Sequence, residues 1–142
     1  MARIGLLEDN ARIARLCATM LQYVNHHVVI YEHPRECLRA LISPSSVYEG
    51  RQQAYRGILP GILPIDVLIL DLHLPEIGGI EVLHYLCGYS HTRALPLIFC
   101  TAAPPSEIAE ALRIAPHASF IEKPFTFQIL TSTIMNVLKE PA

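Results

Sequence analysis

Five short runs of β-forming apolar residues alternate along this chain with five segments in which apolar residues recur at helical spacing. The strand-like runs are residues 3–8, 27–31, 65–70, 95–100 and 118–122. The helical segments begin after Asp9, at Pro34, near Ile80, near Ser106 and after Pro124, and the one near Ser106 is expected to be short. A strand that alternates with a helix in this way is connected to the next strand by a crossover, so the pattern predicts a parallel sheet with helices on both faces.

A common doubly wound order for five such strands is 2-1-3-4-5, the flavodoxin-like arrangement, and we predict this α/β fold. A hydrophobic content of 51% with 17% charged residues suits a sheet that is covered on both faces. The length predicts a single domain over residues 1–142. Residues 43–64 are too long for the connection between the second helix and the third strand, so we interpret them as an insertion.

Charge and composition argue against several classes of function. The net charge is −2 and no cluster of Lys and Arg is present, so we expect no direct binding to nucleic acid. Charged residues interrupt the first ten positions, and two prolines and Asp66 interrupt the apolar stretch 57–70. We therefore expect no membrane segment and a cytoplasmic location. The four cysteines have no metal-binding or redox spacing and are expected to be free thiols.

Carboxylates follow the two strands that flank the switch point of the predicted sheet. Glu8 and Asp9 end the first strand, and Asp71 ends the third. Ligands of doubly wound sheets bind at this point, outside the carboxyl ends of the strands. Two unit charges 4 Å apart repel by about 4 kcal/mol at an effective dielectric of 20, so three unpaired carboxylates there would have raised pKa values or would need a cation. We predict a divalent cation. Hard oxygen ligands favour Mg²⁺ or Mn²⁺.

Two further polar side chains follow the remaining strands at the same edge. Thr101 ends the fourth strand and Lys123 follows the fifth. A metal, a lysine and a hydroxyl provide the positioning and the charge neutralisation that phosphoryl transfer needs. In that chemistry Asp71 is the predicted nucleophile, because carboxylates form aspartyl phosphates.

Each of these residues also has an ordinary interpretation. Asp9 could cap the first helix, Thr101 could be a plain strand residue, and Lys123 could lie on the surface. Their joint placement at one sheet edge favours a functional site. For His73 we favour a solvated ring, although its side chain could overhang the site and affect phosphoryl lifetime.

Four motifs in register resemble the receiver domain of the bacterial two-component response regulators. They are the acidic pair Glu8–Asp9, "DLHLPEIGG" at 71–79, "TA" at 101–102 and "FIEKPF" at 120–125. The resemblance implies that Asp71 accepts a phosphoryl group from the phosphohistidine of a histidine kinase or a phosphotransfer protein. It also implies that Asp9 and Asp71 bind Mg²⁺ directly, that Glu8 acts through water, and that the backbone carbonyl of His73 completes the protein ligands.

The same resemblance implies a switch. Thr101 and Lys123 would contact the phosphoryl oxygens, and Phe120, at a position where tyrosine is common, would couple to Thr101 by changing rotamer. The switch would remodel the surface of the fourth helix, the fifth strand and the last helix, where a downstream protein or an output domain outside this sequence would dock. Whether the chain forms a homodimer stays an open question. The only chemistry expected is self-phosphorylation and self-dephosphorylation, so we do not expect an enzyme.

Two other functions fit the sequence less well. A haloacid-dehalogenase-like phosphohydrolase also uses an Asp nucleophile, but it normally has a second Asp two residues later, where this chain has His73. Its nucleophile also normally ends the first strand. A flavodoxin-like module for a flavin phosphate needs a phosphate-binding loop after the first strand, and "EDNAR" is acidic there.

Overall fold

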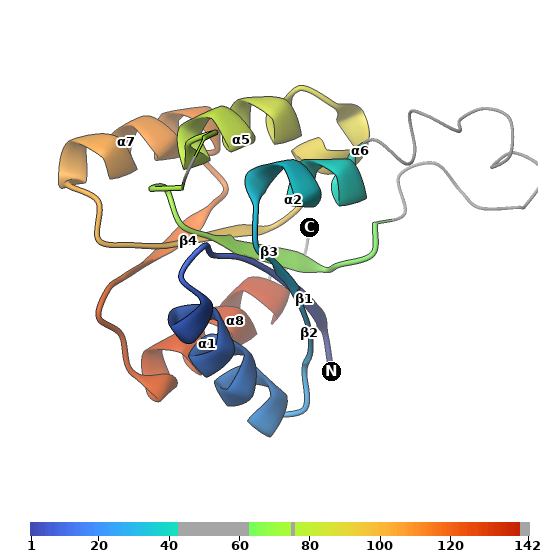
Figure 1. Cartoon of the computed structure of the whole chain (residues 1–142), viewed down its shortest axis with the longest axis vertical. Helices are drawn as coiled ribbons and strands as arrows, with labels where there is room; N and C mark the ends of the chain where they lie inside the picture. Colours follow the sequence, from blue (N-terminus) through green and yellow to red (C-terminus); the bar gives the residue numbers. More distant parts are fainter. Residues whose placement is uncertain (43–62, 75, 140–142) are drawn as a thin grey trace, which may run out of the picture.

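A five-stranded parallel sheet forms the centre of the molecule, in the order β2-β1-β3-β4-β5 (Figure 1). The computed structural model describes residues 1–42, 63–74 and 76–139. The strands are β1 (Arg3–Leu7), β2 (His27–Tyr31), β3 (Val67–Leu70), β4 (Leu97–Thr101) and β5 (Ser119–Glu122). The predicted flavodoxin-like order is therefore confirmed, and strands β3 and β4 each begin two residues later than the sequence predicts.

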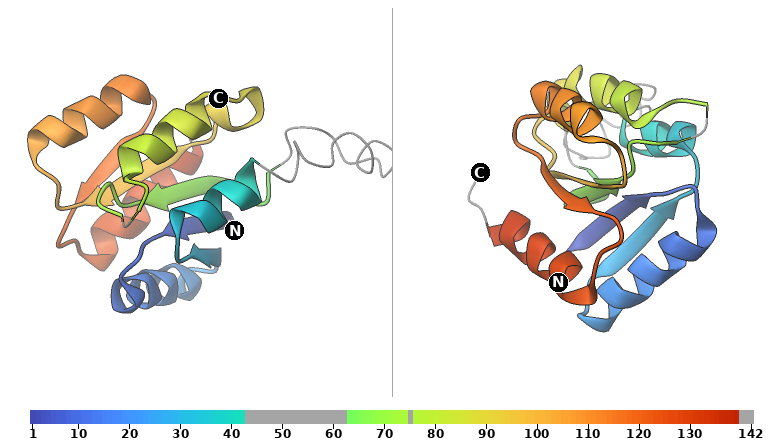
Figure 2. Two further views of the ribbon diagram at one scale, coloured as in Figure 1. Left: turned by 45° about the horizontal axis from the view of Figure 1, so that its top comes forward. Right: turned by 90° about the vertical axis from the view of Figure 1, so that its left-hand side faces the viewer.

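Helices cover both faces of the sheet (Figures 1 and 2). Helices α1 (Ala11–Tyr23) and α8 (Phe127–Lys139) lie on one face. The other face carries α2 (Pro34–Leu41), α5 (Gly79–Cys87), α6 (Ser90–Arg93) and α7 (Pro105–Ile114). The two layers produce two hydrophobic cores, one on each side of the sheet.

The central strand β3 shows why the sequence has an uninterrupted apolar run there. Leu68 and Leu70 belong to the core beneath α2, α5 and α7, whereas Val67 and Ile69 belong to the core beneath α1 and α8. All four side chains are fully buried. A parallel strand that is covered on both faces has no position for a polar residue, which is why Asp71 can appear only where the strand ends.

Two helices on the second face differ from the sequence-based expectation. The four-residue helix α6 was not predicted, because so short a segment has no helical periodicity. Its Thr92 hydroxyl donates a hydrogen bond to the Leu86 carbonyl at 2.5 Å. Helix α7 runs for ten residues from Pro105, and Pro104 is its N-cap, so the two prolines lie at the start of the helix and do not interrupt it.

The predicted insertion falls mostly on residues 43–62, which lie outside the described residues, so it stays a prediction. The chain returns to the sheet at its amino edge, where the backbone N–H of Asp66 donates to the Arg3 carbonyl at 2.6 Å. All four cysteines are free thiols, as expected. Within the part of the chain that the structure describes, no helix combines the length and the apolar character needed to cross a membrane.

Candidate functional site

Three carboxylates meet at the carboxyl edge of β1 and β3. The register of these strands pairs Leu7 with Leu70, so the residues that follow them, Glu8 and Asp71, leave the sheet side by side. Carboxylate oxygens of Glu8, Asp9 and Asp71 all lie within 4.8 Å of one another. The structure thus brings together the three carboxylates among the four predicted metal ligands.

The start of α1 positions the acidic pair. The side-chain oxygen of Asn10 accepts hydrogen bonds from the backbone N–H groups of Arg12 and Ile13, at 3.0 and 3.1 Å. Asn10 is therefore the N-cap, and the alternative that Asp9 caps this helix is wrong. The backbone N–H of Asn10 also donates to Glu8 Oε2 at 3.2 Å, which fixes the Glu8 side chain and leaves the Asp9 carboxylate for the cluster.

Lys123 joins the two buried carboxylates. Its Nζ donates to Glu8 Oε1 at 2.8 Å and to Asp71 Oδ2 at 3.0 Å. Although burial alone favours the neutral amine, the hydrogen bonds to Glu8 and Asp71 raise the pKa of Lys123 to about 12. Burial raises the pKa of the Glu8 carboxyl above its ordinary range, and the hydrogen bond from Lys123 opposes that shift.

The loop after β3 holds the second oxygen of Asp71. The backbone N–H of His73 donates to Asp71 Oδ1 at 3.1 Å, so both carboxylate oxygens accept a hydrogen bond. The sequence suggested a solvated ring for His73, and the structure adds one contact, because its Nε2 lies 2.6 Å from Glu107 Oε1 on α7. The ring nevertheless remains more than half exposed.

Thr101 lies on β4, which pairs with β3, and Phe120 lies on β5, the edge strand beyond β4. Thr101 is fully buried, and its hydroxyl oxygen accepts a hydrogen bond from the backbone N–H of Ala103 at 3.1 Å. The backbone N–H of Lys123 donates to the Thr101 carbonyl at 3.0 Å, so the pairing of β4 with β5 places both residues at the same edge. Phe120 on β5 is 46% exposed, which means that its ring is turned out of the core.

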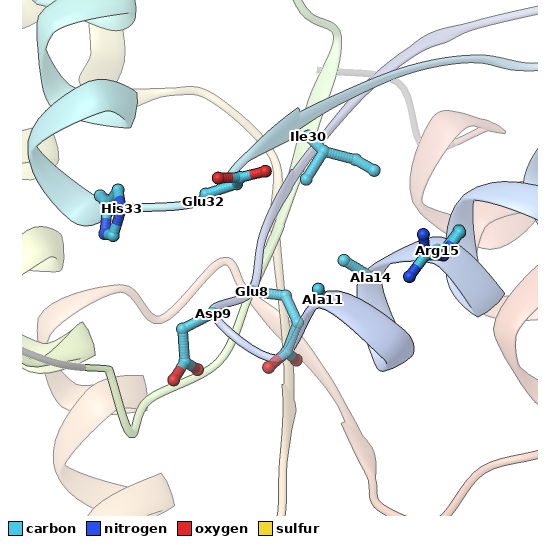
Figure 3. A pocket seen from close by; sticks show the side chains of 8 residues that line it. All are labelled: Glu8, Asp9, Ala11, Ala14, Arg15, Ile30, Glu32 and His33. Atoms are coloured by element: carbon cyan, nitrogen blue, oxygen red, sulfur yellow. The ribbon is translucent and has the colours of Figure 1, made fainter.

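A hollow of about 450 Å³ adjoins the acidic pair on the side of α1 and β2 (Figure 3). Glu32 and His33, which follow β2, lie across this hollow from Glu8 and Asp9. Asp9 is exposed, unlike Glu8 and Asp71. The cluster is therefore open on this side and closed by Lys123 on the side of β5.

The donor set suits a hard divalent cation. Glu8, Asp9 and Asp71 offer three carboxylates, and Lys123 supplies one ammonium group, which leaves two formal negative charges. Two of the carboxylates are buried, where unbalanced charge is costly. Oxygen ligands with an open side that admits water are typical of Mg²⁺ and Mn²⁺ sites, so the residues present fit such an ion.

The doubly wound sheet places this chain among α/β proteins that carry their site at the switch point, and here that site is an acidic cluster with one lysine. The family model of the response regulator receiver domain matches residues 4–135. The chain belongs to this family, and hence to two-component signalling. Receiver domains are generally non-enzymatic signalling modules.

Curated relatives share part or all of this chain. It is similar to the probable histidine kinase 1 of Oryza sativa subsp. indica, with 23% identity over 168 aligned residues that include 96% of the chain and 15% of the kinase. It is also similar to the polar-differentiation response regulator DivK of Brucella ovis, with 30% identity over 73 residues, or 51% of the chain and 59% of DivK. The chain thus spans less than two thirds of the length of these relatives.

Solved structures show the same fold. The receiver domain of a signal transduction histidine kinase from Syntrophus aciditrophicus has a TM-score of 0.73 and 21% identity, covering 98% of this chain and 91% of that one. The BeF3 activated DrrB receiver domain has a TM-score of 0.71 and 17% identity, covering 99% of both chains.

Sequence reasoning found the cluster but missed two residues beside it. Asn10 could have been found, because an Asn directly before a helical segment is a preferred N-cap. Glu107 could not, because it lies 34 residues from His73 and no local pattern marks their contact. The roles of Asp71, Thr101, Lys123 and Phe120, and of the His73 carbonyl as a metal ligand, remain predictions.

Proposed function

We propose that this chain is a phosphorylatable receiver in which Asp71 accepts a phosphoryl group from the phosphohistidine of a histidine kinase or a phosphotransfer protein. The observation that carries the proposal is the contact of Lys123 Nζ with both Glu8 and Asp71 beside the Asp9 carboxylate. One buried, oriented carboxylate beside an ammonium group and two further carboxylates is the arrangement that phosphoryl transfer to an aspartate requires.

In the proposed reaction, an Asp71 carboxylate oxygen attacks phosphorus, a new P–O bond forms, and the P–N bond to the donor imidazole breaks. The electron pair of that bond returns to the imidazole nitrogen. Glu8, Asp9, Asp71 and the backbone carbonyl of His73 would hold Mg²⁺ or Mn²⁺, which supplies charge neutralisation at the phosphoryl oxygens when bound. Lys123 and Thr101 would donate hydrogen bonds to the same oxygens.

The proposed output is a change in a protein-binding surface. Phe120 is exposed on β5, between α7 and α8, and we propose that it turns inward when Thr101 engages the phosphoryl group. A downstream protein, an output domain outside this sequence or a second copy of this chain would recognise the change. We also propose that the chain is a single domain with an insertion at 43–64. We propose a cytoplasmic location and no direct binding to nucleic acid.

The test is the intact mass of the protein after incubation with acetyl phosphate, with and without Mg²⁺. Wild type should gain one phosphoryl adduct only when Mg²⁺ is present, and Asp71→Asn should gain none, because the nucleophilic carboxylate has been removed. Asp66→Asn is the matched control, since Asp66 pairs with Arg3 at the opposite edge of the sheet. An adduct on Asp71→Asn at the wild-type level would overturn the assignment.

A further inference from the structure

His73 connects helix α7 to the acceptor carboxylate. Its backbone N–H donates to Asp71 Oδ1 at 3.1 Å, and its ring Nε2 lies 2.6 Å from Glu107 Oε1. Glu107 sits in the first turn of α7, which begins at Pro105. Through one side-chain and one backbone hydrogen bond, His73 therefore links the surface helix α7 to the Asp71 carboxylate at the centre of the site.

Two further polar contacts among the described residues also bear on the loop that contains His73. The backbone N–H of Gly79 donates to the Leu72 carbonyl at 2.9 Å, at the start of α5. Glu76 pairs with Arg35 of α2 at 3.3 Å, and both side chains are about two-thirds exposed. An exposed pair of that length contributes little. The contact of His73 with Glu107 is shorter, the Glu107 side chain is 40% exposed against 64% for Glu76, and the contact lies two residues from the acceptor.

We propose that Glu107 is a positioning residue. By holding the imidazole of His73, it fixes the loop backbone, which orients Asp71 and presents the backbone carbonyl of His73 to the metal. Residues that hold a metal ligand in place without touching the metal commonly tune metal affinity and activity. Their loss typically lowers affinity or activity by about 10- to 100-fold. This inference rests on the proposed phosphoryl-accepting function of the site.

A purely structural role for Glu107 makes a different prediction. Glu107 lies in the first helical turn, where a negative side chain stabilises the positive end of the helix. Loss of that effect would lower the free energy of unfolding without changing metal affinity. Glu110, exposed on the same helix, offers a matched control with no contact to His73.

The test measures Mg²⁺ affinity by calorimetry, phosphoryl uptake from acetyl phosphate, and the melting temperature of each variant. Glu107→Ala should weaken Mg²⁺ binding and slow uptake by about tenfold. Glu107→Gln should restore most of both, because an amide oxygen can still accept a hydrogen bond from the imidazole. Glu110→Ala should behave as wild type, and His73→Ala combined with Glu107→Ala should lose no more than Glu107→Ala alone.

Three results would overturn the inference. Wild-type Mg²⁺ affinity and uptake in Glu107→Ala would do so, with any drop in melting temperature then assigned to the helix. Additive losses in the double variant would show that the two side chains act separately. Absence of any Mg²⁺-dependent adduct on wild type would overturn the proposed function together with this inference, whereas an adduct on wild type with an unaffected Glu107→Ala would overturn this inference alone.

Discussion

His26 ties the end of the first helix to the first strand through a hydrogen bond that requires a neutral ring. Its Nδ1 accepts from the backbone N–H of Ala2 at 3.1 Å. Burial lowers the pKa of His26 below its ordinary value of 6.5, and the positive charge of the terminal amino group acts in the same direction. Protonation would remove the lone pair that accepts this bond, so folding and protonation of His26 oppose each other.

The consequence is a pH dependence of stability with a definite sign. The unfolded chain binds a proton at His26 from about pH 6.5 downward, before the folded chain does, so the free energy of unfolding should fall as pH drops through this window. His26→Gln should show a smaller loss between pH 7.5 and 5.5, measured by urea denaturation. His27→Gln is the control at the exposed neighbouring position. Equal losses in wild type and His26→Gln would contradict the assignment.

At the scale of single residues, the sequence predicts those functional groups whose place follows from the backbone. Glu8 and Asp71 could be predicted to be neighbours because each directly follows a strand of a parallel sheet, and the register bears this out. The contact between His73 and Glu107 could not be predicted, because it depends on two side-chain rotamers on separate elements. The sequence suggested a solvated His73, and the side chain is indeed 61% exposed, but no pattern in the sequence indicated its contact with Glu107.

At the scale of elements, helix α5 packs directly against the acceptor loop, and Gly79 makes this approach feasible. A Cβ atom on Gly79 would lie 2.5 Å from the Cα of Leu72 and 2.7 Å from the Asp71 carbonyl oxygen, both of them backbone atoms. A Cβ atom on Gly78 would have nothing within 4 Å. Only the structure separates the roles of these two neighbouring glycines.

Substituting the two glycines should thus have unequal effects. Gly79→Ala forces the start of α5 away from the loop, at a cost of about 1–3 kcal/mol in the free energy of unfolding. Gly78→Ala should change stability by about 0.5 kcal/mol or less, because the site is open and its φ of −71° suits any residue. Urea denaturation of both variants checks this. A Gly79→Ala protein as stable as Gly78→Ala would show that the loop moves without strain.

The elements themselves were predicted with uneven success, for reasons that lie in their burial. Strand β3 was clear because it is apolar on both faces, and α1 because its buried side chains recur at helical spacing. Helix α6 has one buried residue, Thr92, in four positions, so no period exists to detect. The ten-residue α7 buries Ala111 and was expected to be short.

At the scale of the whole molecule, the parallel sheet separates two edges with different roles. All five strands end at the edge that carries Glu8, Asp71, Thr101 and Lys123. The connection between α2 and β3 joins the sheet at the opposite edge, because β3 begins at Val67, beside Ile4 near the start of β1. The alternation of strands and helices was enough to predict this separation, since it follows from parallel topology alone.

The separation of edges predicts that residues 47–60 can be removed without loss of phosphoryl uptake. Replacing them with a short Gly linker keeps Ile42 and Leu63, which pack against the core on the side of α2. Loop closure depends only weakly on length, so stability should change by about 1 kcal/mol or less. The matched control keeps the original length and replaces residues 47–60 by Gly and Ser. It separates the effect of the side chains from the effect of the length. Intact mass after acetyl phosphate and Mg²⁺ should show the Asp71 adduct on both proteins. A folded deletion variant without the adduct would place this segment at the phosphoryl site, and loss in both variants would assign that effect to its side chains.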